Sequence, residues 1–124
     1  MNEVVSAENI KELTAPILAK GFSFEYFYQK GGDSSCVYIC RYKKGKDFFD
    51  WREVSGSNDI NIVVCVGGAY AFPSLKYLYK KEYRSFNVKH FFKKPTMAEK
   101  RQFIATLLCK EIESGKPDFF GIKL

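Results

Sequence analysis

Four cysteines and a single histidine are the residues of this chain with the greatest potential for nucleophilic or metal chemistry. A cysteine thiol held beside His90 would be a nucleophile activated by a neighbouring base. The spacing brings no particular cysteine to His90, so this pattern does not favour such a site. Zinc usually requires two close pairs of ligands, whereas Cys65 and Cys109 each stand alone. We therefore expect no structural metal and no cofactor.

Cys36 and Cys40 lie in a segment with the periodicity of a strand. In an extended chain their Cα atoms are about 13 Å apart, which is too far for a disulfide bond. We expect the cysteines to be reduced thiols that pack as small hydrophobic side chains, and this favours a cytoplasmic location. Residues 1–12 show neither the basic nor the apolar region of a signal peptide. No apolar run approaches the roughly 18–20 residues that cross a bilayer, so we expect no membrane partner.

Asp47, Asp50 and Glu53 are conceivable as paired carboxylates for general acid–base chemistry. On a strand, Asp47 and Glu53 share one face and Asp50 faces the other way. We expect them instead to form surface ion pairs, each contributing only about 0–1 kcal/mol. The chain has no GxSxG, HExxH or phosphate-loop pattern, so we expect a protein that is not an enzyme. The basic residues available for the ion pairs are Lys43, Lys44, Lys46 and Arg52.

The positive charge of the chain is concentrated in residues 76–101. The 124-residue sequence has 20 Lys and Arg against 14 Asp and Glu, which gives a net charge of +6. Residues 76–101 hold nine of the basic residues and only two acidic ones, Glu82 and Glu99, so the rest of the chain has a net charge of −1. The nine predicted anion-binding residues are Lys76, Lys80, Lys81, Arg84, Lys89, Lys93, Lys94, Lys100 and Arg101.

Aromatic residues are interleaved with these cations, and two kinds of partner fit such a segment. Lysine and arginine neutralise phosphates while aromatic faces stack on bases, which is typical of RNA or single-stranded DNA binding. A positive patch also steers encounter with an acidic protein. A third interpretation is a solvated connector whose aromatic side chains belong to the core. The aromatic residues that we expect to contact a partner are Tyr77, Tyr79 and Tyr83.

The apolar pattern predicts a helix at the N-terminus and then a run of strands. Ser6 is expected to cap a helix that Gly21 ends, and Pro16 makes this segment either a kinked helix or two short pieces. Apolar and polar residues then alternate, and the short connections favour an antiparallel meander with one face on helices and the other partly wet. Gly67 and Gly68 are expected to end the sheet. The predicted strands cover residues 22–29, 35–42, 48–54 and 60–66.

The C-terminal part of the chain contains one strong helix signal. A short helix is expected from Pro73, whereas residues 83–94 show no clear pattern. Thr96 and Glu99 form a capping box, and a wide apolar stripe follows, which predicts an amphipathic helix over residues 96–114. The last residues are too apolar for a free tail, and we expect them to dock on the body of the protein. These are Phe119, Phe120, Ile122 and Leu124.

Residues 20–27, Lys-Gly-Phe-Ser-Phe-Glu-Tyr-Phe, resemble the RNP1 octamer of the RNA-recognition motif. The resemblance implies aromatic side chains that stack on RNA bases. Ser23 and Glu25 depart from the octamer, and Glu25 would repel phosphate. A helix precedes the segment where that family has a partner strand, so we expect these aromatics to pack across strands and in the core. The matching residues are Lys20, Gly21, Phe22, Phe24 and Phe27.

The order of elements resembles that of small bacterial α+β proteins of unknown function. A leading helix, Gly21-Phe22 at the first strand, a four-stranded meander and a late amphipathic helix carry the resemblance. Some of those proteins are thought to act as immunity proteins beside toxin genes. The resemblance implies a partner-binding protein, and it assigns no binding residues to this chain.

The sequence therefore predicts a single α+β domain over residues 1–124. Its antiparallel sheet of four to five strands forms a meander that packs against an N-terminal helix and a C-terminal amphipathic helix. The predicted function is a non-enzymatic protein-interaction module, immunity-like or regulator-like, that binds an acidic partner through residues 76–101. Binding of RNA or single-stranded DNA through the same segment is the alternative.

Overall fold

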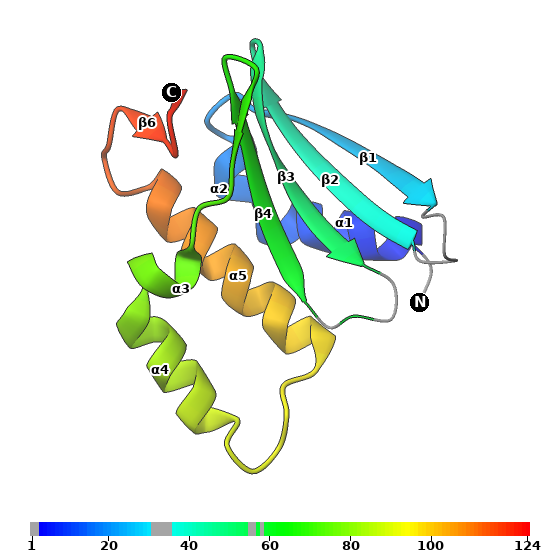
Figure 1. Ribbon diagram of the computed structural model, residues 1–124, viewed down its shortest axis with the longest axis vertical. Coiled ribbons are helices and arrows are strands. Elements are labelled where there is room, and N and C mark those ends of the chain that lie inside the picture. Colours follow the sequence, from blue (N-terminus) through cyan, green and yellow to red (C-terminus); the bar gives the residue numbers. More distant parts are fainter. Residues whose placement is uncertain (1–2, 31–35, 55–56, 58) are drawn as a thin grey trace.

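The computed structural model describes residues 3–30, 36–54, 57 and 59–124, with the side chains of all of these except residues 3–5, 30 and 36. Five strands form one antiparallel sheet in the order β1-β2-β3-β4-β5, with helices on one of its faces (Figure 1). The predicted α+β fold with an antiparallel meander is therefore confirmed. None of the helices in the described residues is long and apolar enough to cross a bilayer. The strands are β1 (Ser23–Lys30), β2 (Cys36–Lys44), β3 (Asp47–Val54), β4 (Ile60–Val66) and β5 (Ala69–Ala71).

The N-terminal segment forms two helices, α1 (Glu3–Leu13) and α2 (Ala15–Leu18). Pro16 lies in the first turn of α2, where a backbone N–H would have no helical partner. Of the two predicted alternatives, a kinked helix or two short pieces, the structure has the two pieces. The predicted start at Ser6 is wrong, because α1 begins at Glu3. Thr14, between the helices, is fully buried; its hydroxyl donates to the Ile10 carbonyl at 2.8 Å and lies 2.6 Å from the Tyr42 hydroxyl.

Gly67 and Gly68 turn the sheet instead of ending it, contrary to the sequence prediction. Their φ angles are +58° and +82°, and two consecutive positive φ values are typical of a type I′ hairpin turn. The turn leads into β5, which pairs only with residues 64–66 of β4. Pro73 follows two residues later; a proline has no N–H for a strand ladder, so the pairing stops there.

The core lies between the helices and the inner face of the sheet. The rings of Tyr42 and Phe49 stack there at 4.5 Å, and Phe119 packs on Phe49 at 5.0 Å. Phe119 and Ile122 are buried in the hairpin of β6 (Asp118–Phe119) and β7 (Ile122–Lys123), so the predicted docking of the C-terminal residues is confirmed for them. Leu124 is exposed and contradicts it. The predicted capping box of Thr96 and Glu99 is present at the start of α5 (Met97–Ile112).

A buried ion pair joins α5 to the sheet. Arg101 of α5 donates two hydrogen bonds to Glu53 of β3, at 3.0 and 2.7 Å, and the indole N–H of Trp51 donates to the same carboxylate at 2.8 Å. Arg101 and Glu53 are 8% and 7% exposed. The prediction that Glu53 forms a surface ion pair is therefore wrong, because the inward face of β3 carries it under α5.

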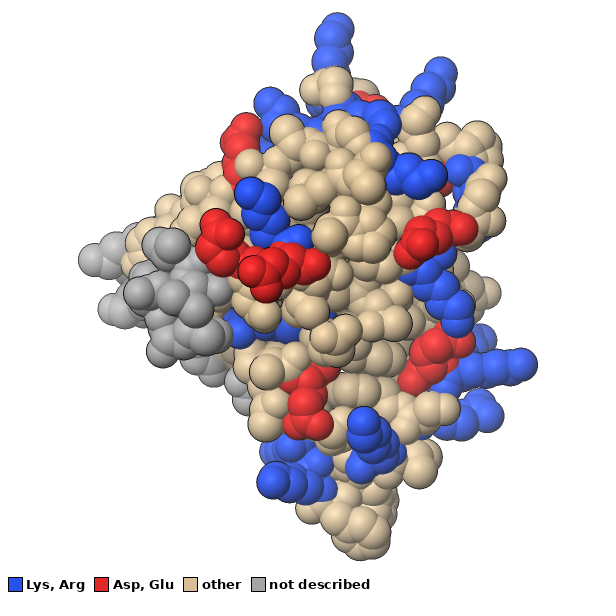
Figure 2. Space-filling view, turned by 180° about the vertical axis from the view of Figure 1, so that it is seen from behind, with Lys and Arg blue, Asp and Glu red and all other residues tan. Residues whose placement is uncertain are grey.

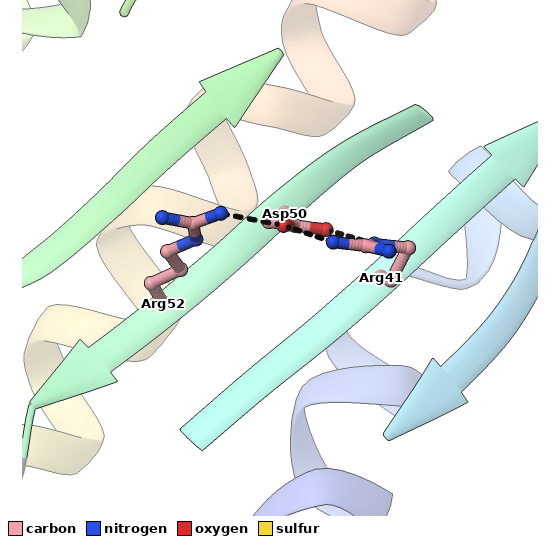
Figure 3. Close-up of polar contacts among 3 residues, drawn as sticks. All are labelled: Arg41, Asp50 and Arg52. Carbon is pink, nitrogen blue, oxygen red and sulfur yellow. Dashed lines mark hydrogen bonds and ion pairs between the residues drawn. The ribbon is translucent and has the colours of Figure 1, made fainter. Parts of the chain in front are cut away.

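The outer face of the sheet holds a second buried carboxylate. Asp50 accepts two hydrogen bonds from Arg41, at 2.7 and 2.9 Å, and one from Arg52 at 3.1 Å, in a line across β2 and β3 (Figure 3). The Arg41 guanidinium also lies over the rings of Phe27 and Phe48. Asp50 is fully buried, so the prediction of a surface ion pair is wrong here too. The hydrogen bond to Asp50 raises the pKa of Arg41, although its burial acts the other way.

Two further helices, α3 (Leu75–Leu78) and α4 (Lys80–Lys89), lie on the outside of α5 (Figure 1). Phe103 of α5 is stacked on Phe86 at 4.2 Å and lies edge-on to Tyr83 at 4.9 Å. Glu82 lies near Lys110 and His90 near Glu99, so α4 and α5 are antiparallel. Helix α4 covers most of the stretch that showed no clear pattern in the sequence.

Replacing Arg101 by Met should lower the free energy of unfolding by about 3 kcal/mol, because Glu53 would keep a buried charge without its cation. The double variant Arg101→Met/Glu53→Gln should recover much of this loss, since Gln is neutral and still accepts from Trp51. Lys110→Met on the exposed side of α5 is the matched control, with a change of about 0–1 kcal/mol. Urea unfolding followed by the fluorescence of Trp51 measures all three. A loss below about 1 kcal/mol for Arg101→Met would contradict the proposed role of the pair.

Candidate interaction surface

Seven of the nine predicted cations are exposed on α3, α4 and the connection to α5. No described carboxylate lies within 4.0 Å of any of their charged nitrogens. In the reverse view, Lys and Arg side chains gather at both ends of the long axis, and the lower end is where α4 and the connection to α5 lie (Figure 2). We call the seven exposed cations the basic surface. Its members are Lys76, Lys80, Lys81, Arg84, Lys89, Lys93 and Lys94.

The other two predicted cations do not belong to the basic surface. Arg101 points inward and binds Glu53, so its assignment to an exposed anion-binding site is wrong. Lys100 is half-buried in the first turn of α5. The apolar stripe of α5 offered a signal for Arg101, because this residue lies three positions before Ile104 and seven before Leu108 and so shares their face of the helix.

Tyr77 is the most exposed of the three predicted aromatic contacts, and Tyr79 and Tyr83 are half-buried. Tyr77 is 70% exposed, with the Lys80 ammonium 4.7 Å from its ring centre. Tyr79 donates a hydrogen bond to Glu111 at 2.5 Å, and its burial and this bond raise the pKa of Tyr79. Tyr83 packs edge-on against Phe103 of α5. Tyr79 and Tyr83 therefore hold α3 and α4 in place.

Other apolar side chains take the exposed positions on this surface. Phe91 is 78% exposed and Phe92 is 97% exposed, with their rings in edge-to-face contact, and Val88 of α4 is also exposed. A helix over residues 80–89 places Phe86 on the α5 side and leaves Phe91 and Phe92 beyond its end. Recognising the spacing of Tyr83 and Phe86 as helical would have predicted this arrangement.

Helix α4 divides the basic surface into two flanks. On one flank, Lys76, Lys80 and Arg84 line a hollow of about 430 Å³ together with Val88 and Phe91. We call it the basic hollow. On the other flank, Lys81 and Lys89 line a shallower depression. The three cations of the basic hollow therefore lie beside the exposed side chains of Val88 and Phe91.

A groove lies between β4 and the α3–α4 pair. Its upper part, about 540 Å³, runs beside residues 60–63 of β4 and is lined by Arg52, Leu75 and Lys76 among others. Its lower part, also about 540 Å³, includes Asp59 and Lys94. Tyr83 and Ile104 line both parts, so the two parts are adjacent. We call this feature the edge groove, and it opens beside the basic hollow, which shares Lys76 and Tyr83 with it.

The structure does not bring His90 to any described cysteine thiol. His90 packs on Phe86 and lies 3.6 Å from the Glu99 carboxylate, whereas Cys109 follows Glu99 on α5 by about 15 Å along the helix axis. Cys40 is buried on the inner face of β2, where burial raises the pKa of its thiol to about 12. Among the described residues, no three His, Cys, Asp or Glu side chains are grouped to hold a metal ion. The side chain of Cys36 lies outside the described residues.

Comparison with known proteins adds no identification: no family model, no curated protein and no solved structure matches this chain. The function of the protein is therefore inferred from its residues and their geometry.

Cys40 should resist alkylation in the folded protein. Burial and a pKa of about 12 leave only about one part in 10⁴ of its thiol ionised at pH 8. Iodoacetamide treatment of a Cys36→Ser variant, followed by peptide mass spectrometry, should show Cys40 unmodified until urea unfolds the protein. Free cysteine in a short peptide is the reference for full reactivity. Modification of native Cys40 at the reference rate would show that its environment is not the dry core described above.

Proposed function

We propose that this protein is a non-enzymatic protein-interaction module that binds an acidic protein partner through the basic surface. The observation that supports this most strongly is the basic hollow. There Lys76, Lys80 and Arg84 lie together without a described carboxylate near them, and the apolar side chains of Val88 and Phe91 complete the lining.

The composition of this surface suits a protein partner. Unpaired cations increase the rate of encounter with a negatively charged surface and select against basic partners. Exposed apolar side chains then gain from burial on contact, at about 25 cal/mol for each Å² removed from water. An exposed apolar cluster with a charged surround is typical of an interaction site on a soluble protein.

RNA or single-stranded DNA is the second candidate partner. The exposure of Phe91 and Phe92 beside Lys93 and Lys94 favours it, because exposed rings can stack on unpaired bases. The contacts of Tyr79 with Glu111 and of Tyr83 with Phe103 count against it, since they leave these two expected stacking residues only partly exposed. We therefore rank the acidic protein first.

An immunity-like or regulator-like role fits a module of this kind, and we propose it on the order of the elements alone. We also propose a cytoplasmic location, where thiols stay reduced. The described cysteines Cys40, Cys65 and Cys109 are all free thiols, which suits that compartment.

The double variant Lys80→Glu/Arg84→Glu should lose the partner, because it reverses two of the three charges in the basic hollow. Lys81→Glu/Lys89→Glu is the matched control, with the same change of charge on the other flank of the same helix. The measurement is affinity enrichment from the source cells by the wild type and both variants, followed by purification of the protein that the control retains. The dissociation constant of this partner should rise about tenfold or more for Lys80→Glu/Arg84→Glu and not for the control. For the wild type it should rise with salt concentration.

Equal retention by both variants would contradict a role for the basic hollow. Short mixed-sequence oligonucleotides, titrated by fluorescence anisotropy, test the second candidate. Nucleic-acid binding would appear as a steep fall of log K with log salt, about −0.7 for each phosphate contacted on a single strand. Such a slope, abolished by Lys80→Glu/Arg84→Glu, would replace the acidic protein with a nucleic acid as the partner.

A further inference from the structure

The edge groove borders a strand edge that has no partner strand within the described residues, although the side chains of Ile62 and Val63 are buried. Strand β4 pairs with β3 over residues 60–65, but β5 pairs only with residues 64–66 of β4. Because Pro73 and the start of α3 carry the chain away from the sheet, residues 60–63 have a partner strand on the β3 side alone. Alternate backbone N–H and C=O groups of this half-strand point into the edge groove, where an extended chain can pair with them.

The two sides of this edge offer different surroundings. Ile60 and Ile62 face the core side, where the edge groove is lined by Leu75, Tyr83 and Ile104. Asn61 and Val63 face the outer side, where Arg52 is the cross-strand neighbour of Asn61. Since side chains of a strand alternate between two faces, an added strand would place every second residue on an apolar surface and the others beside a cation.

The charge of the edge groove favours an acidic chain. Arg52, Lys76 and Lys94 line it, and Asp59 is the carboxylate among the described lining residues. Arg52 gives one hydrogen bond to Asp50, while its buried Nε–H has no hydrogen-bond partner in the described structure. The Arg52 side chain as a whole is 32% exposed, so the accessible part of its guanidinium can donate to a carboxylate of a bound chain.

We propose that the edge groove binds an extended acidic segment of the partner protein, which adds to β4 as a further strand beside residues 60–63. Apolar residues of the segment contact Leu75 and Ile104, and acidic residues at the alternate positions contact Arg52 and Lys76. This inference depends on the proposed function, because it specifies how the acidic partner is held. It assigns the backbone contact to β4 and leaves the basic hollow as the steering surface beside it.

A second copy of this chain is a poorer occupant of the same edge. Pairing two copies through β4 would bring Arg52 and Lys76 of one copy towards those of the other, in a protein that already has a net charge of +6. Like charges placed opposite one another across a strand pair are destabilising. An acidic segment meets no such repulsion.

The test begins with selection from a displayed library of random peptides about eight residues long, enough to span the four-residue edge with residues to spare on each side. The selected peptides should alternate acidic and apolar residues. In the full-length protein labelled with ¹⁵N, the amides of residues 60–63 that point away from β3 should become protected from hydrogen exchange when the peptide binds. Peptides with a helical spacing of apolar residues, or no selected peptide, would overturn the proposal.

Backbone pairing is tested with two N-methylated forms of the selected peptide. Each form carries methyl groups at alternate residues, and the two patterns are complementary. An added strand uses only one edge of the peptide, so one pattern should weaken binding about tenfold or more and the other should be tolerated. Equal effects of the two patterns would overturn strand addition.

The charge preference is tested with Lys76→Glu, and Lys46→Glu in the β2–β3 turn is the matched control. Of these two variants, only Lys76→Glu should weaken binding of the acidic peptide, by about tenfold. If the selected peptide instead perturbs the amide signals of α4, and Lys80→Glu/Arg84→Glu abolishes its binding, strand addition fails while the proposed function stands. If analytical ultracentrifugation shows dimers and the amides of residues 60–63 are already protected without peptide, a second copy occupies the edge and the proposal is overturned.

Discussion

The bidentate contact between Arg101 and Glu53 fixes the position of α5, and the functional surface depends on that position. The pair holds the first turns of α5 over β3, while the capping box at Thr96 sets where the helix begins. Helix α5 then carries α3 and α4, because Phe103 lies between the rings of Tyr83 and Phe86 and Glu111 accepts from Tyr79. The distance between α4 and β4 sets the width of the edge groove. A local ion pair therefore determines the shape of a surface on the other side of the helix.

The protein uses its arginines and lysines differently. Three of the four arginines bind buried carboxylates on the two faces of the sheet. Arg41 and Arg101 each donate two hydrogen bonds to one carboxylate, as the planar guanidinium allows, and Arg52 donates one. The lysines of α3 and α4 are left in water, with Arg84 as the one arginine among them. Lysine is a compact charge on a long stem, so this surface attracts anions without imposing a geometry on them. Specific recognition then requires groups with fixed directions, and the backbone of β4 provides these.

Sequence patterns predicted the elements that have one strong local cause. The alternation of β1 to β4, the break at Pro16 and the capping box at Thr96 each follow from the residues themselves. The sequence patterns failed to predict features that depend on tertiary contacts. Asp50 and Glu53 were predicted to lie at the surface, because the arginines that bind them come from other elements, β2 and α5. Helix α4 was missed because only Tyr83 and Phe86 form its apolar face. The cations were predicted as a set, although Arg101 lies three residues before Ile104 and so shares the apolar face of α5 that turns towards the core.

Pro73 connects the architecture to the proposed recognition. Had β5 continued past Ala71, it would have covered residues 60–63 and closed the sheet on that side. The proline stops the ladder and sends the chain into α3, so the same residue both exposes the edge and supplies the opposite wall of the edge groove. An exposed edge is an aggregation hazard that proteins limit with charge. Here Arg52 and Lys76 provide that charge, which repels other copies of this basic protein and attracts an acidic segment of a partner. The feature that protects the edge from self-association therefore also selects its partner.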